Sequence, residues 1–295
     1  MTILEKFKGI KVLEVTDDYF LGSKGYQIFK YDFSLKKYDF FASVIDKYSF
    51  FSKYSLLRRF LRAEINGLYS LKNGGYLVIA KKGIFYKNNH SSVFRKVFSI
   101  PRGSRPLNLC ELPNGHIYWG EYFANIGKEA VHVYVSIDGG LTWKIAYTFS
   151  EGNINHIHGL FWDEFTNRLW FCTGDRENEC IIGYTEDEFK TIVEVFRGNQ
   201  EYRSCQLFFY EHFVVFATDS QYVQNEIKMF ARDSMQINSL VKIQGTAIKG
   251  GQLGNISFLS TTVEPSEMNK DRYSHLWITD DGISWREIFK EKKDI

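Results

Sequence analysis

The residues best suited to chemistry in this sequence lie in NINHIHGLFWDEFTNRLWFCTGDRENEC, which runs from Asn153 to Cys180. His156 and His158 are two residues apart, so on a β-strand their side chains point to the same face. Asp175 follows the next apolar run. Imidazoles beside a carboxylate can transfer protons near neutral pH or bind a divalent metal ion. We predict His156, His158 and Asp175 as catalytic residues with no cofactor; the alternative is a divalent metal, such as Mn, Zn or Ca, held by His156 and His158.

Repeated strand patterns indicate how these residues are positioned. Units of roughly 40–50 residues recur along the chain, each with four short strand-like runs, and this period is typical of propeller blades. The sequence has 295 residues, of which 44% are hydrophobic and 17% aromatic, so it can form a large core rich in strand-forming residues. We predict an all-β fold: one domain, residues 1–295, forming a six-bladed β-propeller of four-stranded blades. The predicted blades are residues 9–47, 60–100, 104–149, 154–197, 200–243 and 246–291.

Polar residues recur at equivalent positions of the predicted blades. In a propeller, the start of each inner strand and the loop between the second and third strands lie on one face, so these residues should gather at one end of the central channel, where a site is expected. Arginines there can bind a carboxylate or phosphate through paired hydrogen bonds. Besides the histidines and Asp175, the predicted catalytic residues are Glu121 and Tyr122; the predicted substrate-binding residues are Arg62, Arg105, Asn125, Gln200, Arg203, Asp219, Asn225 and Glu264.

Two turns resemble a known motif. SIDGGLTWK (Ser136 to Lys144) and TDDGISWRE (Thr279 to Glu287) resemble the Asp-box of BNR-repeat, sialidase-like β-propellers, and TEDEFKT (Thr185 to Thr191) is similar but lacks the Gly and Trp. In such a turn the Asp accepts backbone N–H groups and Gly permits a positive φ. The segments GEYFAN, HIHG, TGD, QEYR and TDSQYVQN are similar to those of BNR-type proteins encoded near surface-polysaccharide genes.

The resemblance implies turn-stabilising roles for Asp138 and Asp281 and carbohydrate-related work for the opposite face. Sialidases bind the substrate carboxylate with three arginines, and Arg62, Arg105 and Arg203 are the candidates here. Their Tyr–Glu nucleophile pair has a counterpart only in the adjacent Glu121 and Tyr122. The family's Arg-Ile-Pro signature is absent, and PRGSRP resembles it only loosely.

Three functions fit these observations. The first is an enzyme that cleaves or modifies an acidic sugar or glycan. As a glycosidase it would use Asp175 and Glu121 as acid and base; as a lyase it would use a histidine base and arginines that neutralise a uronate carboxylate. The second is a metal site at the histidine pair. The third is a non-catalytic propeller that binds a glycan or a protein, which exposed aromatic side chains would favour.

Composition argues against several other classes. The net charge of +2, without a long basic run, excludes a nucleic-acid partner, and no apolar run reaches the ~18 residues of a membrane helix. The N-terminus lacks a signal-peptide pattern, which predicts a cytoplasmic protein with its four cysteines as free buried thiols. The oligomeric state stays open. KYSFFSKYSLLRRFLR (Lys47 to Arg62) is interpreted as a short basic amphipathic helix, either a packed cap or a membrane-surface contact.

Overall fold

The structure is a computed structural model that describes residue 7 and residues 9–293. Strands dominate it, which confirms the all-β prediction. The chain divides into two compact units: Met1–Ile117 with Val135–Lys144, and Tyr118–Tyr134 with Ile145–Ile295. Among the described residues no helix is long and apolar enough to cross a membrane.

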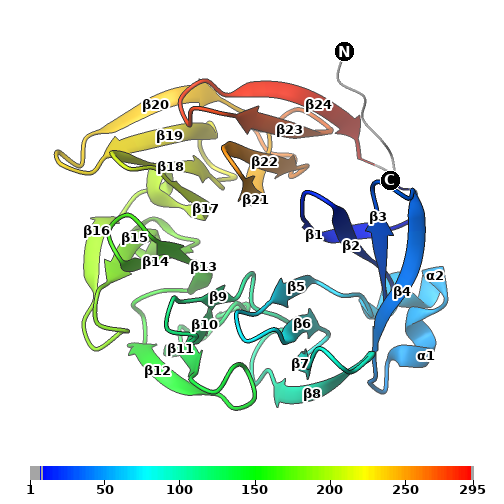
Figure 1. Ribbon diagram of the computed structural model, residues 1–295. Coiled ribbons are helices and arrows are strands. Elements are labelled where there is room, and N and C mark those ends of the chain that lie inside the picture. Colours follow the sequence, from blue (N-terminus) through cyan, green and yellow to red (C-terminus); the bar gives the residue numbers. More distant parts are fainter. Residues whose placement is uncertain (1–6, 8, 294–295) are drawn as a thin grey trace. The chain divides into compact units, whose positions relative to one another are not determined.

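The first unit contains an eight-stranded sheet with the order β1-β2-β3-β4-β8-β7-β6-β5 (Figure 1). Its strands are β1 (Lys11–Val15), β2 (Tyr19–Lys24), β3 (Gln27–Asp32), β4 (Lys37–Val44), β5 (Gly67–Ser70), β6 (Tyr76–Ala80), β7 (Gly83–Lys87) and β8 (Val93–Ser99). The sheets therefore differ from the six separate four-stranded sheets expected. The reason is local: two antiparallel sets of four strands are joined where β4 pairs with β8 in parallel, through Ser43 with Val93 and Val44 with Phe94.

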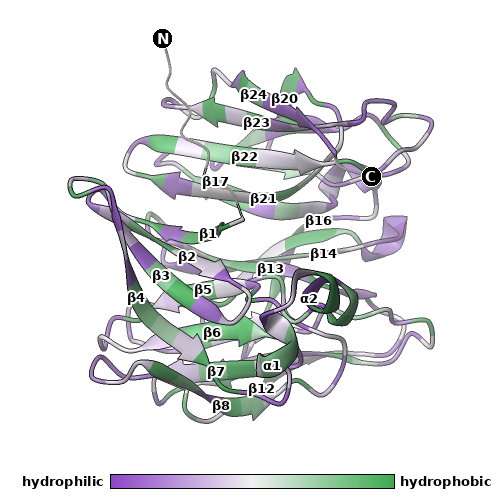
Figure 2. Cartoon of the chain, turned by 90° about the vertical axis from the view of Figure 1, so that its right-hand side faces the viewer, coloured by the Kyte–Doolittle hydropathy of each residue, from purple (hydrophilic) through white to green (hydrophobic). Residues whose placement is uncertain are grey.

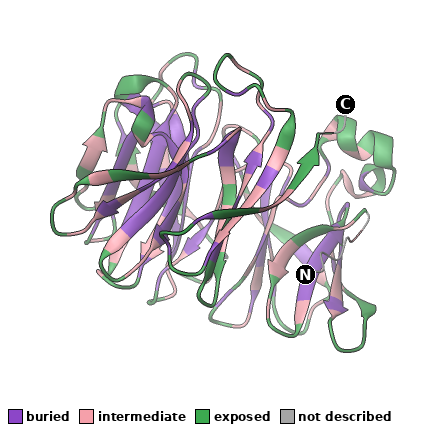
Figure 3. Cartoon of the chain, turned by 90° about the horizontal axis from the view of Figure 1, so that it is seen from above, coloured by how far each residue is buried: buried purple, intermediate pink, exposed green. Residues whose placement is uncertain are grey.

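The core of this sheet is apolar. Ile28, Val78, Phe85 and Phe94 are fully buried there. Two short helices, α1 (Ser49–Ser52) and α2 (Ser55–Leu61), lie in the connection between β4 and β5. They are drawn almost entirely in the colour of exposed residues (Figure 3), and α2 has no buried residue. Tyr48 and Leu61 of this segment pack against the core, whereas Phe50, Leu56 and Phe60 face solvent, so the segment fits the packed-cap interpretation only in part.

A four-stranded sheet with the order β12-β11-β10-β9 has residues in both units. Its strands are β9 (Cys110–Glu111), β10 (Ile117–Gly120), β11 (Val131–Ser136) and β12 (Lys144–Phe149). The segment that follows β10 begins at Glu121, a predicted site residue.

The second unit contains three more four-stranded antiparallel sheets, each in chain order. Their strands are β13 (His156–Asp163), β14 (Arg168–Gly174), β15 (Ile181–Thr185), β16 (Val193–Arg197), β17 (Ser204–Phe209), β18 (Phe213–Thr218), β19 (Glu226–Ala231), β20 (Ile237–Lys242), β21 (Thr246–Leu253), β22 (Ile256–Thr262), β23 (Tyr273–Thr279) and β24 (Arg286–Lys292). Two 3₁₀ turns, η1 (Glu177–Glu179) and η2 (Gln200–Tyr202), precede β15 and β17. Hydrophobic and hydrophilic residues are mixed along the strands (Figure 2), and β14 and β18 are buried over almost their whole length. The core side chains include Trp170, Phe216, Phe208 and Leu259.

The hairpin of β13 and β14 positions the histidines. His156 pairs with Gly174 at one end of the hairpin, and Asp163 pairs with Arg168 at the other. The register shifts between Ile157 and Gly159, so His158 is the extra residue of a β-bulge. A bulge re-aims the side chain of the residue it adds and is common beside functional sites.

Three turns share one hydrogen-bond pattern. Asp138 accepts hydrogen bonds from the Thr142 N–H and hydroxyl, and Asp281 accepts them from the N–H groups of Ile283 and Ser284. Asp187 in TEDEFKT accepts the same two bonds from Thr191. This third turn was expected to have degenerated without Gly and Trp. It keeps its geometry because Glu188 and the buried Phe189 adopt the positive φ instead.

Candidate functional site

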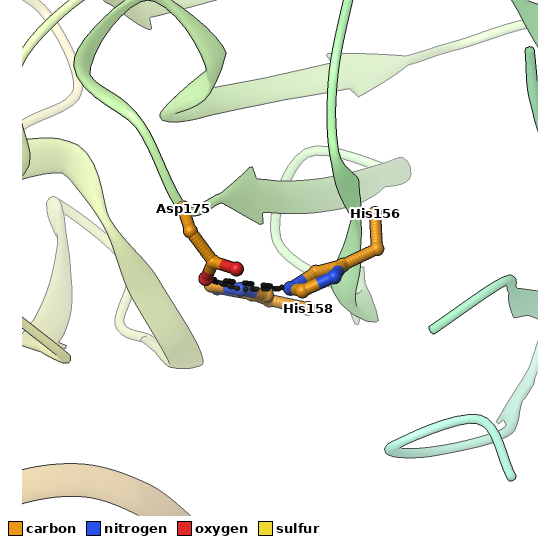
Figure 4. A group of neighbouring side chains, drawn as sticks. All are labelled: His156, His158 and Asp175. Atoms are coloured by element: carbon orange, nitrogen blue, oxygen red, sulfur yellow. Dashed lines mark hydrogen bonds and ion pairs between the residues drawn. The ribbon is translucent and has the colours of Figure 1, made fainter. Parts of the chain in front are cut away.

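His156, His158 and Asp175 point toward one another at the open end of the β13–β14 hairpin (Figure 4). The two Nε2 atoms are 3.0 Å apart, and each is 3.4 Å from Oδ1 of Asp175. Both imidazoles are buried, whereas about one third of the Asp175 side chain is exposed. The start of β13 and the end of β14 thus bring the three predicted catalytic side chains within contact distance of one another. Solvent reaches the cluster at Asp175.

Backbone carbonyls orient both imidazole rings. Nδ1 of His156 is 3.0 Å from the Phe123 carbonyl oxygen, and Nδ1 of His158 is 3.1 Å from that of Ser204. A carbonyl oxygen only accepts, so both contacts are made when Nδ1 carries the proton. His156 Nδ1 also has the Asn155 amide Nδ2 at 3.2 Å, whereas the contact of His158 Nδ1 is with the carbonyl. In the neutral rings the two Nε2 atoms then present lone pairs to each other, which is favourable only when a proton or another cation lies between them.

Arg203 and Asp219 extend the cluster on the side of β17. Arg203 Nη2 is 2.9 Å from Asp175 Oδ1, and its Nε is 3.8 Å from Asp219 Oδ2, beyond hydrogen-bond range. Asp219 also accepts the Cys205 thiol at 3.2 Å. The guanidinium is therefore shared by two carboxylates, and its positive charge is largely balanced within the protein.

Burial and these contacts shift the pKa values of the cluster. Burial lowers the pKa of His158 to about 4, despite the opposing influence of Asp175. Burial alone would raise the pKa of Asp175, but the two imidazoles 3.4 Å away and the charge of Arg203 hold it well below its usual range. Burial raises the pKa of Asp219 to about 6, against the effect of Arg203. Asp175 is thus ionised at neutral pH and is a poor proton donor.

Tyr122 and Glu121, the other predicted catalytic residues, face in different directions. The Tyr122 ring lies against His156 with a centroid separation of 4.3 Å, and burial raises its pKa to about 12. Glu121 is fully buried, and its carboxylate accepts the His132 backbone N–H at 2.9 Å. Tyr122 belongs to the cluster, while Glu121 bonds to the neighbouring strand β11.

Several predicted substrate-binding residues hold the surrounding loops. Gln200 donates to the Asp175 carbonyl oxygen at 2.8 Å and accepts from Ser220. Asn225 bonds to Ser220, and Asn125 bonds to both backbone groups of Glu129. Glu264 accepts from the side chain of Gln221. Arg62 and Arg105 belong to the first unit, whereas every residue of the cluster described above belongs to the second.

Two contributors were missing from the predicted site. Asn155 donates to Asp175 Oδ2 at 3.0 Å, and Cys205 bonds to Asp219. Asn155 adjoins the histidine pair in sequence, which is a usable signal. Cys205 shows no such signal, because a lone cysteine in an apolar run has the pattern of an ordinary core thiol; all four cysteines are indeed free and buried.

Comparison with known proteins shows the fold class: a β-propeller. A chain from the crystal structure of an ancestral GH74 enzyme matches with a TM-score of 0.58 at 11% identity, over 96% of this chain and 38% of that chain. A chain of a nidogen/laminin complex matches with a TM-score of 0.58 at 11% identity, over 93% of both chains. The putative TolB from Agrobacterium tumefaciens matches with a TM-score of 0.51 at 10% identity, over 79% of this chain and 81% of the TolB chain. This chain therefore spans well under half of the GH74 chain.

At the level of sequence, no family model matches the chain. A search of curated proteins likewise found no match. The likeness to the three solved structures therefore concerns the fold.

Proposed function

We propose that this protein is a six-bladed propeller enzyme that cleaves or modifies an acidic sugar or glycan at the His156–His158–Asp175 cluster. Four consecutive strands fall within each of the six predicted blade segments, with β24 ending one residue beyond its segment. The match to a GH74 enzyme supports a carbohydrate substrate.

The observation that carries the proposal is the imidazole pair itself. Two buried imidazoles with their Nε2 atoms 3.0 Å apart bring two lone pairs together when both rings are neutral, which costs free energy unless a proton or another cation lies between them. Clusters of this kind are found mainly where a ligand or a reaction uses them. A structural role would be served better by groups that satisfy one another.

The geometry favours elimination over hydrolysis by two carboxylates. Glycosidases commonly pair a carboxylic acid with a carboxylate across the scissile bond. Here Asp175 is held ionised, and Glu121 bonds to the His132 backbone. In an elimination, a histidine Nε2 removes the proton next to the sugar carboxylate, and the electron pair forms the C=C bond. The glycosidic C–O bond at the neighbouring carbon breaks, and the departing oxygen keeps its electron pair and takes a proton from the imidazolium or from water to become a hydroxyl group.

A non-catalytic glycan-binding function is the second candidate, and one residue favours it. Tyr222 is 69% exposed, and its loop is tied to the cluster, because its N–H donates to Ser220, which bonds to Gln200. An exposed aromatic ring whose loop is tied to a polar cluster is suited to stacking on a sugar face. The same ring would also position a substrate, so binding alone does not separate the two functions.

Measuring product formation from a glycan substrate distinguishes the enzyme from the non-catalytic binding protein. We expect a purified sample incubated with uronate-containing oligosaccharides to produce unsaturated ends, detected as new absorbance from the C=C bond conjugated with the carboxylate. Tyr222→Ala should weaken oligosaccharide binding, and His158→Asn should stop turnover. Saturable binding with no release of either unsaturated or hydrolysed product would reject the enzyme and favour the binding function.

A further inference from the structure

We infer that His156, His158 and Asp175 bind one divalent first-row metal ion through the two Nε2 atoms and Oδ1. The inference rests on the proposed function and changes one step of it: an Nε2 atom that holds a metal cannot also accept a proton, so a hydroxide bound to the ion would take the place of histidine as the base. Metal binding itself can be measured without any turnover. The atoms form a triangle with sides of 3.0, 3.4 and 3.4 Å.

The size of this triangle fits such an ion. The point equidistant from its three corners lies about 1.9 Å from each, and protein ligands bind Zn²⁺ at about 2.0–2.2 Å. An ion at bonding distance from all three atoms therefore sits slightly out of their plane. The angles at that ion would be about 95–110°, which leaves at least one coordination position open. Asp175 is partly exposed, so solvent or substrate can reach the site from its side.

The surroundings of the ligands have the features of a metal site. Each imidazole donates Nδ1–H to a backbone carbonyl, that of Phe123 or of Ser204, which leaves Nε2 free to coordinate. Asp175 also receives hydrogen bonds from Arg203 and Asn155, and such bonds commonly orient a ligating carboxylate. Two imidazoles and one carboxylate favour Zn²⁺ or a neighbouring first-row ion over Mg²⁺ or Ca²⁺.

A metal would also supply a charge that the cluster lacks. Arg203 is shared between Asp175 and Asp219, so it offers little uncompensated positive charge to an acidic sugar. An ion bound to two neutral imidazoles and one carboxylate keeps a net positive charge. It could therefore attract the carboxylate of the substrate that we propose.

The second group of potential ligands, His158, Cys205 and Asp219, is a weaker candidate. The Nδ1 atom of His158 donates to Ser204, the thiol donates to Asp219, and Arg203 lies beside the same carboxylate. All three residues are buried, so this group offers no open position for a substrate.

The test uses chelator-treated full-length protein titrated with ZnCl₂ by calorimetry, and with CoCl₂ followed by visible absorption. We expect one ion per chain and a raised thermal midpoint. His156→Ala and Asp175→Asn should each weaken binding by 100-fold or more, with His132→Ala as the matched control. Circular dichroism will verify folding, and because Asp175 is partly exposed, Asp175→Asn keeps the test valid if the histidine variant unfolds.

Absence of stoichiometric Zn²⁺ and Co²⁺ binding, or binding that both cluster variants leave unchanged, would overturn the inference. Turnover of an acidic glycan by metal-free protein would reject the metal while retaining the enzyme. Tight binding without turnover of any uronate substrate would retain the metal and reject the proposed reaction.

A second, independent observation concerns helices α1 and α2. Hydrophobic residues lie along both helices (Figure 2), and the side chains of Phe60, Leu56 and Phe50 are 84%, 80% and 60% exposed. The segment between Lys47 and Ala63 contains no acidic residue and five basic ones: Lys47, Lys53, Arg58, Arg59 and Arg62. We infer that this helical patch, residues 47–62, binds an anionic lipid surface.

An anionic lipid surface is the partner that fits the positive charge of this helical patch. Apolar side chains flanked by cations insert at the headgroup boundary of an anionic bilayer, and the cations remain at its surface. A cavity of about 720 Å³ beside the helices adds Lys24 to the lining together with Lys53 and Arg58, although it also contains Asp46. Arg58 forms an ion pair with Glu64 at 3.3 Å, so the other cations contribute most of the available charge.

Sedimentation with phosphatidylcholine vesicles, with and without phosphatidylglycerol, tests the inference. We expect binding only to the anionic vesicles, weakened by salt. Leu56→Ser with Phe60→Ser should reduce the bound fraction at least 5-fold, while Ile126→Ser, which alters an equally exposed aliphatic residue, should not. No binding to anionic vesicles, or self-association through the same residues in their absence, would overturn it.

Discussion

The hairpin of β13 and β14 holds two buried aspartate–arginine clusters, one at each end, and they are built on opposite principles. At the turn end, Asp163 forms a two-pronged ion pair with Arg232 at 2.5 and 3.0 Å. The same carboxylate accepts hydrogen bonds from Thr166, the Trp170 indole and the Phe165 backbone N–H. Every contact to Asp163 comes from a donor, and its side chain is fully buried.

At the open end, Asp175 faces an arginine as well, but its other neighbours are not fully satisfied. The two Nε2 atoms beside it present lone pairs to each other, and one third of the carboxylate reaches solvent. This difference between the Asp163 and Asp175 clusters distinguishes charged residues that stabilise the fold from those that we propose for function. A structural cluster is closed and complete, whereas the cluster that we propose as the site lacks a cation and opens to solvent.

The largest expected effect on stability is at the closed cluster. Asp163→Ala removes one partner of a buried ion pair and leaves the Arg232 guanidinium without it, which typically costs about 3–5 kcal/mol. We therefore expect the free energy of unfolding in urea to fall by about that amount. A loss below about 1 kcal/mol would mean that the two clusters do not differ as described.

The sequence predicted much of the open cluster and none of the closed one. His156, His158, Asp175 and Arg203 were placed together because each lies at the end of a strand in a repeating pattern. The pairing of Asp163 with Arg232 joins residues 69 positions apart, and no repeat or motif marks it. The bulge at His158 was also unforeseen, because it depends on the register of β14.

The arrangement of the sheets also depends on contacts that the sequence pattern does not reveal. Strand-forming runs gave the strand positions within each repeat. The parallel contact of β4 with β8, which merges two sets of strands into one sheet, depends on a tertiary approach at Ser43 and Val44. The helices between β4 and β5 show a similar limit, since an amphipathic pattern does not reveal that Leu61 is packed against the core while Leu56 and Phe60 are exposed.

An intermediate effect is expected at the turn carboxylates, which are satisfied by backbone groups and lie near solvent. Asp138→Ala removes hydrogen bonds to Leu141 and Thr142 and should lower the free energy of unfolding by about 1–2 kcal/mol. Zn²⁺ affinity measured by calorimetry should not change. Weaker binding at unchanged stability would show that this turn contributes to the site.

Acid should remove the stabilisation from these turns. Hydrogen bonds from Thr191 lower the pKa of Asp187 to about 2, below its unfolded value near 3.8. A lowered folded-state pKa stabilises the protein above the unfolded pKa, and this contribution is lost as the pH falls from about 4 toward 2. Thermal midpoints of wild type and Asp187→Asn should therefore differ at pH 7 and converge at low pH. A constant difference across this range would contradict the assignment.

A smaller change in stability is expected at the open cluster. In metal-free protein, Asp175→Asn should lower the free energy of unfolding by less than Asp163→Ala does: the ion pair with Arg203 is lost, but water reaches this side chain and the amide keeps its shape. Metal binding and turnover should nevertheless be lost. If Asp175→Asn instead destabilised the protein as much as Asp163→Ala, both aspartates would be structural.

The smallest expected effect is at Asn155, which borders the open cluster and also lies 3.2 Å from His156 Nδ1 through its Nδ2. Its Nδ2 donates to Asp175 Oδ2 at 3.0 Å, and its Oδ1 lies 3.4 Å from the Lys128 ammonium, which also pairs with Glu179. Because Oδ1 of Asp175 faces the imidazoles while Oδ2 is held by Asn155, this amide sets the angle of the carboxylate. Loss of such an outer partner commonly weakens metal binding by about 10–100-fold.

Asn155→Ala should therefore leave the urea midpoint almost unchanged but shift the Zn²⁺ titration by roughly 10-fold, less than Asp175→Asn does. Asn155→Asp provides the sharper comparison, since a second carboxylate next to Asp175 would repel it and disturb the angle without removing bulk. Asn178→Ala, at an exposed position in η1, is the matched control. Equal affinity in wild type and Asn155→Ala would show that the imidazoles and Arg203 alone orient Asp175.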